Sequence, residues 1–277
     1  MRKPAITFTA LLAFAACATD TDEDDPADDS DPDAIALMTH PDDDVAGSMI
    51  RQIEGVEDDL PFPTAVAQTP GMDVSSHQGN VNWAGARANG ARFAYVKATE
   101  GTTYRNPFFA QQYNGSYNIG MIRGSYHFAI PNDSAGATQA DYFIAHGGGW
   151  SADGKTLPGA LDIEYNPYGA TCYGFSQSGM VSWISAFLNR YHSRTGRWAV
   201  IYTTTDWWST CTGNYSGFWA NSPLWIARYT SSPGTLPAGA PTWSFWQYSS
   251  TGPFAGDSNQ WNGALDRLKV LACNGTC

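Results

Sequence analysis

Two carboxylates, Asp162 and Glu164, stand one residue apart at the end of the apolar run PGALDIEY (158–165). Side chains two positions apart on a strand project to the same face, so both should point one way and Ile163 the other. Buried and unpaired they would be costly, so we expect them in a cleft. Neighbouring carboxylates push their pKa values apart, as glycoside hydrolysis requires of a proton donor and its partner. The alternative is a structural role, in which the two carboxylates pair with arginine or cap the next turn.

The elements that would position this pair alternate along residues 71–277. Seven apolar, β-rich runs are expected strands: 71–76, 91–99, 120–130, 158–165, 198–204, 223–230 and 242–250. The clearest helix is 177–195, which Ser176 can cap and Gly196 follows. Alternation of this kind predicts an α/β fold. We expect a single, irregular β/α barrel of the TIM type with its groove at the C-terminal ends of the strands. An open doubly wound sheet is the alternative.

The first 17 residues have the pattern of a secretory signal. Arg2 and Lys3 precede the apolar run Ile6–Ala16, which is too short to span a bilayer. The sequence LAFAAC ends on Cys17 and resembles a lipoprotein signal, with lipidation of Cys17 expected. Ordinary cleavage after Ala15 or Ala18 is the alternative. The protein is therefore expected to be exported and anchored by lipid at a bacterial membrane.

Residues 18–68 are expected to form an acidic, disordered tether. Of the 26 acidic residues of the chain, 16 lie within residues 20–59, where little apolar surface could be buried. The stretch VAGSMIRQIEGVEDDLPFP within it is less polar and could form a short helix, as part of a linker or a propeptide. From Gly71 onward the charges nearly balance and no basic stripe is present, which argues against a nucleic-acid partner.

Five cysteines in an exported chain leave one without a partner. If Cys17 is lipidated, four remain and allow three pairings. We favour Cys172–Cys211 and Cys273–Cys277. Their spacing and the scattered histidines do not indicate a metal site.

Seven motifs, in order, resemble glycoside hydrolase family 25, the Chalaropsis-type lysozymes, and within it the actinobacterial-type members. They are GMDVSSHQGNVNW (71–83), FAYVKATEGTTYRNPFF (93–109), GMIRGSYHFA (120–129), ALDIEY (160–165), VIYTTTDWW (200–208), LWIARY (224–229) and FWQYSS (245–250). The resemblance covers a domain of residues 69–277. It implies a monomeric N-acetylmuramidase that cuts the β-1,4 bond between N-acetylmuramic acid and N-acetylglucosamine in peptidoglycan glycan strands, with no cofactor.

Four acidic residues match the family's catalytic positions. Glu164 matches the general acid, and Asp162 matches the carboxylate that steers the 2-acetamido group of the substrate. Asp73 matches a groove acid. Asp257, two residues before Asn259, matches a further acid, although Gly256 replaces the usual hydrophobic residue. The resemblance implies retention of configuration through the substrate acetamido group. Direct attack by water, with Asp162 or Asp73 as the base, is the alternative.

Other side chains are expected to support this groove. Tyr126 and Tyr202 would line it, and Lys97 would pair with Glu100 beside it. One or two tryptophans, Trp246 among them, would contact sugar rings. His77 is expected to have a structural role in a turn. Two other functions stay open: a peptidoglycan-binding module without catalysis, and a chitinase-like hydrolase.

Overall fold

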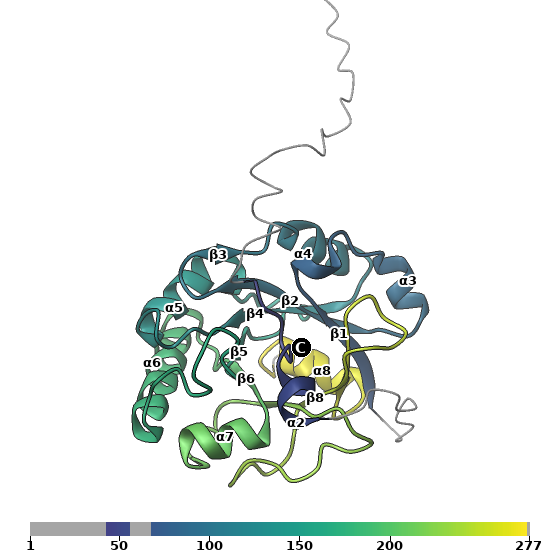
Figure 1. Cartoon of the computed structure of the whole chain (residues 1–277). Coiled ribbons are helices and arrows are strands. Elements are labelled where there is room, and N and C mark those ends of the chain that lie inside the picture. Colours follow the sequence, from purple (N-terminus) through teal and green to yellow (C-terminus); the bar gives the residue numbers. More distant parts are fainter. Residues whose placement is uncertain (1–42, 56–67, 276–277) are drawn as a thin grey trace, which may run out of the picture.

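The computed structural model describes residues 43–55 and 68–275, and there one sheet closes into a barrel with helices around it (Figure 1). The strands are β1 Thr69–Val74, β2 Phe93–Glu100, β3 Tyr104–Arg105, β4 Ile122–Phe128, β5 Ala160–Asp162, β6 Val200–Thr203, β7 Leu224–Ala227, β8 Phe245–Ser249 and β9 Asp257–Trp261. The helical elements are α2 Ile50–Glu54, η1 Ser76–Gln78, α3 Trp83–Ala88, α4 Phe109–Asn118, α5 Gly136–Phe143, η2 Ile144–Gly148, α6 Gln177–Thr195, α7 Thr205–Thr212 and α8 Leu265–Ala272. The expected signal and Cys17 lie outside the described residues.

The ring follows the order β1-β9-β8-β7-β6-β5-β4-β2, and pairing of β1 with β2 closes it. The short β3 is an antiparallel addition to β2. All seven expected strands are present, and six successive pairings around the ring, from β1–β2 to β7–β8, are parallel. The prediction of an irregular β/α barrel is therefore confirmed, and the open-sheet alternative is wrong.

The irregularity is β9, which runs antiparallel to both of its neighbours, β8 and β1. Because its direction is reversed, β9 begins at the rim where the parallel strands end. Asp257, the first residue of β9, lies opposite Asp73 near the end of β1. The sequence analysis did not predict this strand.

Alternating side chains point either into the barrel interior or out toward the helices, and three buried clusters result. The first fills the barrel interior; its members include Phe93, Tyr95, Tyr126, Tyr202, Trp225 and Phe245. The second, here called the outer core, lies between the barrel and helices α5, α6 and α7; its members include Leu161, Ile163, Ile184, Phe187, Ile201, Ile226 and Trp246. The third packs β1 and β2 against α3; its members include Met72, Val74, Trp83, Ala94 and Val96. Residues of opposite parity on a strand therefore have different environments, and this decides which side chains can reach a site at the barrel mouth.

Helix α6 forms over the predicted residues 177–195. The Ser176 hydroxyl accepts a hydrogen bond from the amide of Gly179, and Gly196 ends the helix in the left-handed conformation. The face that holds Met180, Ile184 and Phe187 packs into the outer core, as its periodicity predicts.

Both ends of the barrel interior are covered. Leu268 and Ala272 of α8 join the interior core, and Arg197, just before β6, donates to the Leu271 carbonyl, which places α8 at the N-terminal end. At the other end lie residues 43–55, here called the N-terminal segment, which contains α2; its Ala46 and Ile50 are fully buried in the same core (Figure 1).

The expectation of a disordered tether over residues 18–68 is therefore wrong for residues 43–55. The short helix considered for this stretch is present as α2. Apolar side chains at Ala46 and Ile50 give the segment something to bury, which the charge of the surrounding sequence obscures.

Candidate active site

Asp162 and Glu164 lie at the C-terminal mouth of the barrel, each only 1% exposed. They alternate with Leu161 and Ile163, whose side chains enter the outer core, so the expected division of the D-x-E motif between two faces is confirmed. Among the described residues, neither carboxylate oxygen of Asp162 nor Oε2 of Glu164 has a hydrogen-bond partner. Buried carboxylate oxygens without hydrogen-bond partners lower the stability of a fold, and such groups are typical of catalytic sites.

Burial raises the pKa of both carboxyls well above the ordinary range. For Asp162 the second cause is the neighbouring Glu164 charge. For Glu164 burial again dominates, offset in part by the hydrogen bond from the Gly47 amide. A raised pKa keeps a proton on this pair at a pH where an exposed carboxyl would have lost it.

Asp73 lies at the same mouth, near the end of β1, and is 3% exposed. Its Oδ2 accepts hydrogen bonds from Asn259 Nδ2 at 2.5 Å and from Gln247 Nε2 at 3.0 Å. Burial raises its pKa to about 6, and these two donors limit the rise. The Trp225 indole donates to Asn259 Oδ1 at 2.8 Å, which fixes the orientation of that amide.

Asp257 reaches the same site because β9 is reversed. Its Oδ2 accepts from Gln247 Nε2 at 3.0 Å. Burial and the Asp73 charge raise its pKa well above the ordinary range. The structure therefore brings all four expected acids to one end of the barrel.

Gln247 on β8 is the residue that the sequence analysis missed. Its Oε1 accepts from the hydroxyls of Tyr202 at 2.7 Å and Tyr229 at 3.1 Å, and its Nε2 faces Asp73 and Asp257. The two tyrosine hydroxyls thus orient an amide that donates to two acids. The quoted motif FWQYSS contained Gln247, and its alternation with Trp246 and Tyr248 was the available signal.

Of the aromatic side chains expected in the groove, two lie in the barrel interior and one lies in the outer core. Tyr126 and Tyr202 lie in the barrel interior with their side chains buried. Trp246 lies on the opposite face of β8 from Gln247, packs against Trp243 and Tyr248, and donates to the Arg228 carbonyl at 2.8 Å. The structure does not bring Trp246 to the four acids.

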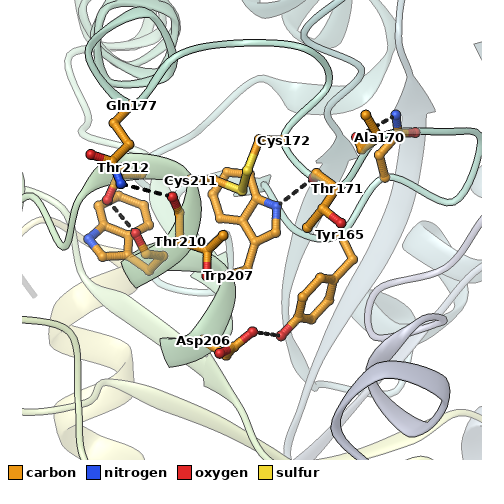
Figure 2. Close-up of a disulfide and its surroundings, with 12 residues drawn as sticks. Tyr165, Ala170, Thr171, Cys172, Gln177, Asp206, Trp207, Thr210, Cys211 and Thr212 are labelled. Atoms are coloured by element: carbon orange, nitrogen blue, oxygen red, sulfur yellow. Dashed lines mark hydrogen bonds between the residues drawn. A yellow bond between two sulfur atoms is a disulfide. The ribbon is translucent and has the colours of Figure 1, made fainter.

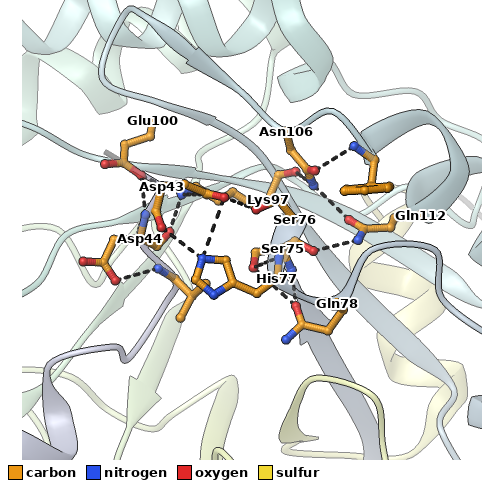
Figure 3. A network of polar contacts seen from close by, with 12 residues as sticks. Asp43, Asp44, Ser75, Ser76, His77, Gln78, Lys97, Glu100, Asn106 and Gln112 are labelled. Carbon is orange, nitrogen blue, oxygen red and sulfur yellow. Dashed lines mark hydrogen bonds and ion pairs between the residues drawn. The ribbon is translucent and has the colours of Figure 1, made fainter. Parts of the chain in front are cut away.

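Lys97 is fully buried at the mouth and forms the expected ion pair with Glu100, with 2.6 Å between Nζ and Oε2 (Figure 3). It also pairs with Asp43 of the N-terminal segment at 2.8 Å. His77 lies in the η1 turn, which Ser75 and Gln78 cap reciprocally, and its Nε2 lies 3.0 Å from the Asp43 carbonyl. Turn geometry around His77 is as expected.

The predicted Cys172–Cys211 disulfide is present and joins the loop after β5 to α7 (Figure 2). Two hydrogen bonds accompany it: the Trp207 indole donates to the Thr171 carbonyl at 3.0 Å, and the Gln177 amide donates to the Thr210 carbonyl at 3.1 Å. The loop that follows Asp162 and Glu164 is therefore fixed to the scaffold. Cys277 lies outside the described residues, so Cys273–Cys277 stays a prediction.

No cluster of three or more histidine, cysteine or acidic side chains in the described ranges is arranged to hold a metal ion. Over the same ranges, no helix has the length and apolar character needed to cross a membrane.

Comparison with known proteins gives a consistent result. The family model of the glycosyl hydrolases family 25 matches residues 72–257. Lysozyme M1 of Streptomyces globisporus is 52% identical over 217 residues, which are 76% of this chain and 74% of that protein. The N,O-diacetylmuramidase of Chalaropsis sp is 53% identical over 206 residues, 73% of this chain and 98% of that protein. The solved bacterial lysozyme of Streptomyces coelicolor is 52% identical with a TM-score of 0.74, and 76% of this chain covers all of it.

Proposed function

The chain belongs to the glycosyl hydrolases family 25, and on that premise we propose that it is an N-acetylmuramidase. Its substrate is the glycan strand of peptidoglycan, cut between N-acetylmuramic acid and N-acetylglucosamine. The observation that carries this proposal is the buried pair Asp162 and Glu164 at the barrel mouth, of whose four carboxylate oxygens only Glu164 Oε1 accepts a hydrogen bond from another described residue. A wall-binding module without catalysis has no use for two buried carboxylates, each of which lowers the stability of the fold.

In the mechanism we propose, Glu164 is the general acid and protonates the glycosidic oxygen, because its raised pKa keeps the proton available. The 2-acetamido oxygen of the sugar then attacks its own anomeric carbon, and Asp162 orients that amide and offsets the developing positive charge. Water opens the resulting ring with Glu164 as the base, so configuration is retained. Two side chains of one strand cannot easily flank the bond from opposite faces, which favours this route over a carboxylate nucleophile.

Asp73 and Asp257, both hydrogen-bonded to Gln247, are proposed to bind substrate at the far side of the groove from β5. Tyr126, Tyr202 and Lys97 are proposed to complete its lining. The reaction requires no metal or organic cofactor in this scheme.

The disulfide is typical of a protein exported to an oxidising compartment. We further propose that Cys17 carries lipid and holds the enzyme, as a monomer, at a membrane surface. The charged residues that follow Cys17 support this, since they give the anchor a long polar spacer.

Digestion of purified peptidoglycan, with mass spectrometry of the products, tests the function. Muramic acid at the new reducing ends is expected, and N-acetylglucosamine there would contradict the bond assignment. Proton NMR of the first product formed distinguishes retention from inversion. The digestion should use a chain that begins at Gln68, because residues 43–55 contact Glu164 and the core at the barrel mouth.

A further inference from the structure

The N-terminal segment (residues 43–55) lies across the mouth of the barrel, where the four acids are (Figure 1). It contacts residues at the ends of β1, β2, β5 and β8. Asp43 binds Ser76 and Lys97, and the Asp44 amide donates to Glu100 at 3.0 Å (Figure 3). Arg51 donates to Ser250 at 2.8 Å. The Tyr165 hydroxyl donates to Glu54 at 2.8 Å. These contacts come from all sides of the opening.

The centre of the segment reaches the reactive groups themselves. The amide of Gly47 donates to Glu164 Oε1 at 2.5 Å, and the Ala46 carbonyl accepts from Gln247 Nε2 at 3.2 Å. These two atoms belong to one peptide group. The Gly47 amide thus occupies an oxygen of the proposed general acid, and the Ala46 carbonyl occupies the amide that also contacts Asp73 and Asp257, so this peptide group satisfies partners that would otherwise face the substrate.

The position of the Ala46–Gly47 peptide group requires glycine at position 47. Its φ is +84°, and a Cβ there would lie 2.3 Å from the Tyr229 hydroxyl, 2.8 Å from Gln247 Oε1 and 2.9 Å from the Tyr202 hydroxyl. Those three groups are buried and joined by hydrogen bonds, so they have little freedom to move aside. Any larger residue would be excluded from the slot beside Glu164.

We propose that the N-terminal segment is an intramolecular inhibitor, which occupies the substrate groove and holds the chain inactive until the segment leaves. This rests on the proposed function, because the groove it fills is the proposed glycan site. Covalent attachment gives such a segment an effective concentration on the order of millimolar, so modest intrinsic affinity is enough to exclude a polymer substrate. Cutting the attachment removes that advantage and lets the segment dissociate.

The first test uses the full-length chain with two matched glycine substitutions. Gly47→Ala should raise the rate of peptidoglycan hydrolysis at least about tenfold, the change that a loss of 1.4 kcal/mol of binding produces. Gly55→Ala is the control, because Gly55 also has a positive φ, of +65°, but a Cβ there meets nothing within 4 Å. Equal rates for the parent, Gly47→Ala and the chain that begins at Gln68 would overturn the proposal.

The second test supplies the segment in trans. The solved Streptomyces coelicolor lysozyme corresponds in full to about three-quarters of this chain, the share that residues 68–277 make up, so the barrel folds without the segment. A synthetic peptide of residues 43–55 should bind the chain that begins at Gln68, by calorimetry, and inhibit its hydrolysis. The same peptide with Gly47→Ala should do neither.

The two readouts separate the two proposals. If the chain that begins at Gln68 hydrolyses no peptidoglycan, the proposed function fails, whereas binding of the peptide would still show an intramolecular ligand. If that chain is active but the peptide neither binds nor inhibits, the inhibitor proposal fails and the function stands.

Discussion

Asp73 and Asp257 face each other across the β1–β9 pair, and Gln247 Nε2 lies 3.0 Å from an oxygen of each. A single amide thus donates to two acids from different strands, while two tyrosine hydroxyls hold its oxygen. Asp162 at the end of β5 and Glu164 just beyond it have no such donors from the barrel strands among the described residues. The mouth therefore has one side whose geometry is fixed by hydrogen bonds and one side left with unsatisfied oxygens.

The first prediction concerns Glu164. In the chain that begins at Gln68, Glu164→Gln should lower hydrolysis by about 10²–10⁴-fold, because the amide cannot donate the proton. The melting temperature should not fall, because the amide has the size and shape of the carboxyl and introduces no charge. A folded variant that clears cell walls at the parent rate would remove Glu164 from the role of acid.

The second prediction concerns the substitution Gln247→Met. The hydroxyls of Tyr202 and Tyr229 would lose their acceptor and Asp73 would lose a donor, which should reduce the free energy of unfolding by about 1–3 kcal/mol. In the chain that begins at Gln68, hydrolysis should fall as well, with the pH profile shifted, because the pKa of Asp73 would rise further without the Gln247 donor. The neighbouring Trp246→Phe is the control: its side chain lies in the outer core, so KM should be unchanged. A raised KM for Trp246→Phe, with parent values for Gln247→Met, would reverse these assignments.

Thirdly, the Cys172–Cys211 disulfide closes a loop with a sequence separation of 39. The chain-entropy model gives it up to about 4 kcal/mol. In a domain of this size that corresponds to a melting temperature lowered by about 8–16 °C, measured by calorimetry on the Cys172→Ser/Cys211→Ser double variant. A reductant should lower the melting temperature of the parent by breaking this disulfide, and this contribution should be absent in the double variant. Unchanged melting would mean that the loop is held by its hydrogen bonds alone.

The fourth prediction is a pH dependence of stability. Burial raises the pKa of Asp73 from 3.8 to about 6, so the folded chain binds a proton more tightly than the unfolded chain does. Stability from this group is therefore greatest below about pH 4 and is lost as the pH rises through about 6, by about 1–3 kcal/mol. Asp73→Asn should flatten this part of the profile in the full-length chain. A profile equally steep in parent and variant would assign the effect to other carboxyls.

A fifth prediction tests the anchor. Cys17→Ser should move the protein from the membrane fraction to the soluble fraction and leave the hydrolysis rate of the barrel unchanged. Mass spectrometry of the mature parent should find residue 17 with acyl groups at the N-terminus. A mature chain that starts at residue 16 or 19 without lipid would mean ordinary secretion.

Local patterns made the barrel and its main acids predictable. Helix α6 has apolar residues at helical spacing, a capping Ser176 and a terminating Gly196, so periodicity and caps agree. The separation of Asp162 and Glu164 from Leu161 and Ile163 follows from alternation alone, because acidic and apolar residues take turns over these four positions.

Tertiary contacts decide what the sequence did not reveal. Strand β9, DSNQW, is short and polar, and its ladder forms because β8 and β1 leave a gap of one strand. Trp246 and Gln247 are adjacent in sequence, and only the direction of β8 in the ring shows which of them faces the mouth. The N-terminal segment lies within a strongly acidic stretch of sequence, and the groove that buries its apolar residues is assembled from residues far along the chain.

The reversed strand β9 also sets when the barrel can form. It is the last strand of the sheet to be synthesised, and it fills the gap between β8 and β1, where Thr69 pairs with Trp261. Until those final residues are available the ring stays open, with β1 and β8 as unpaired edges. A chain that lacks these residues therefore cannot complete the ring. The strand that carries Asp257 to the active site thus also delays completion of the fold until the whole barrel sequence has been delivered.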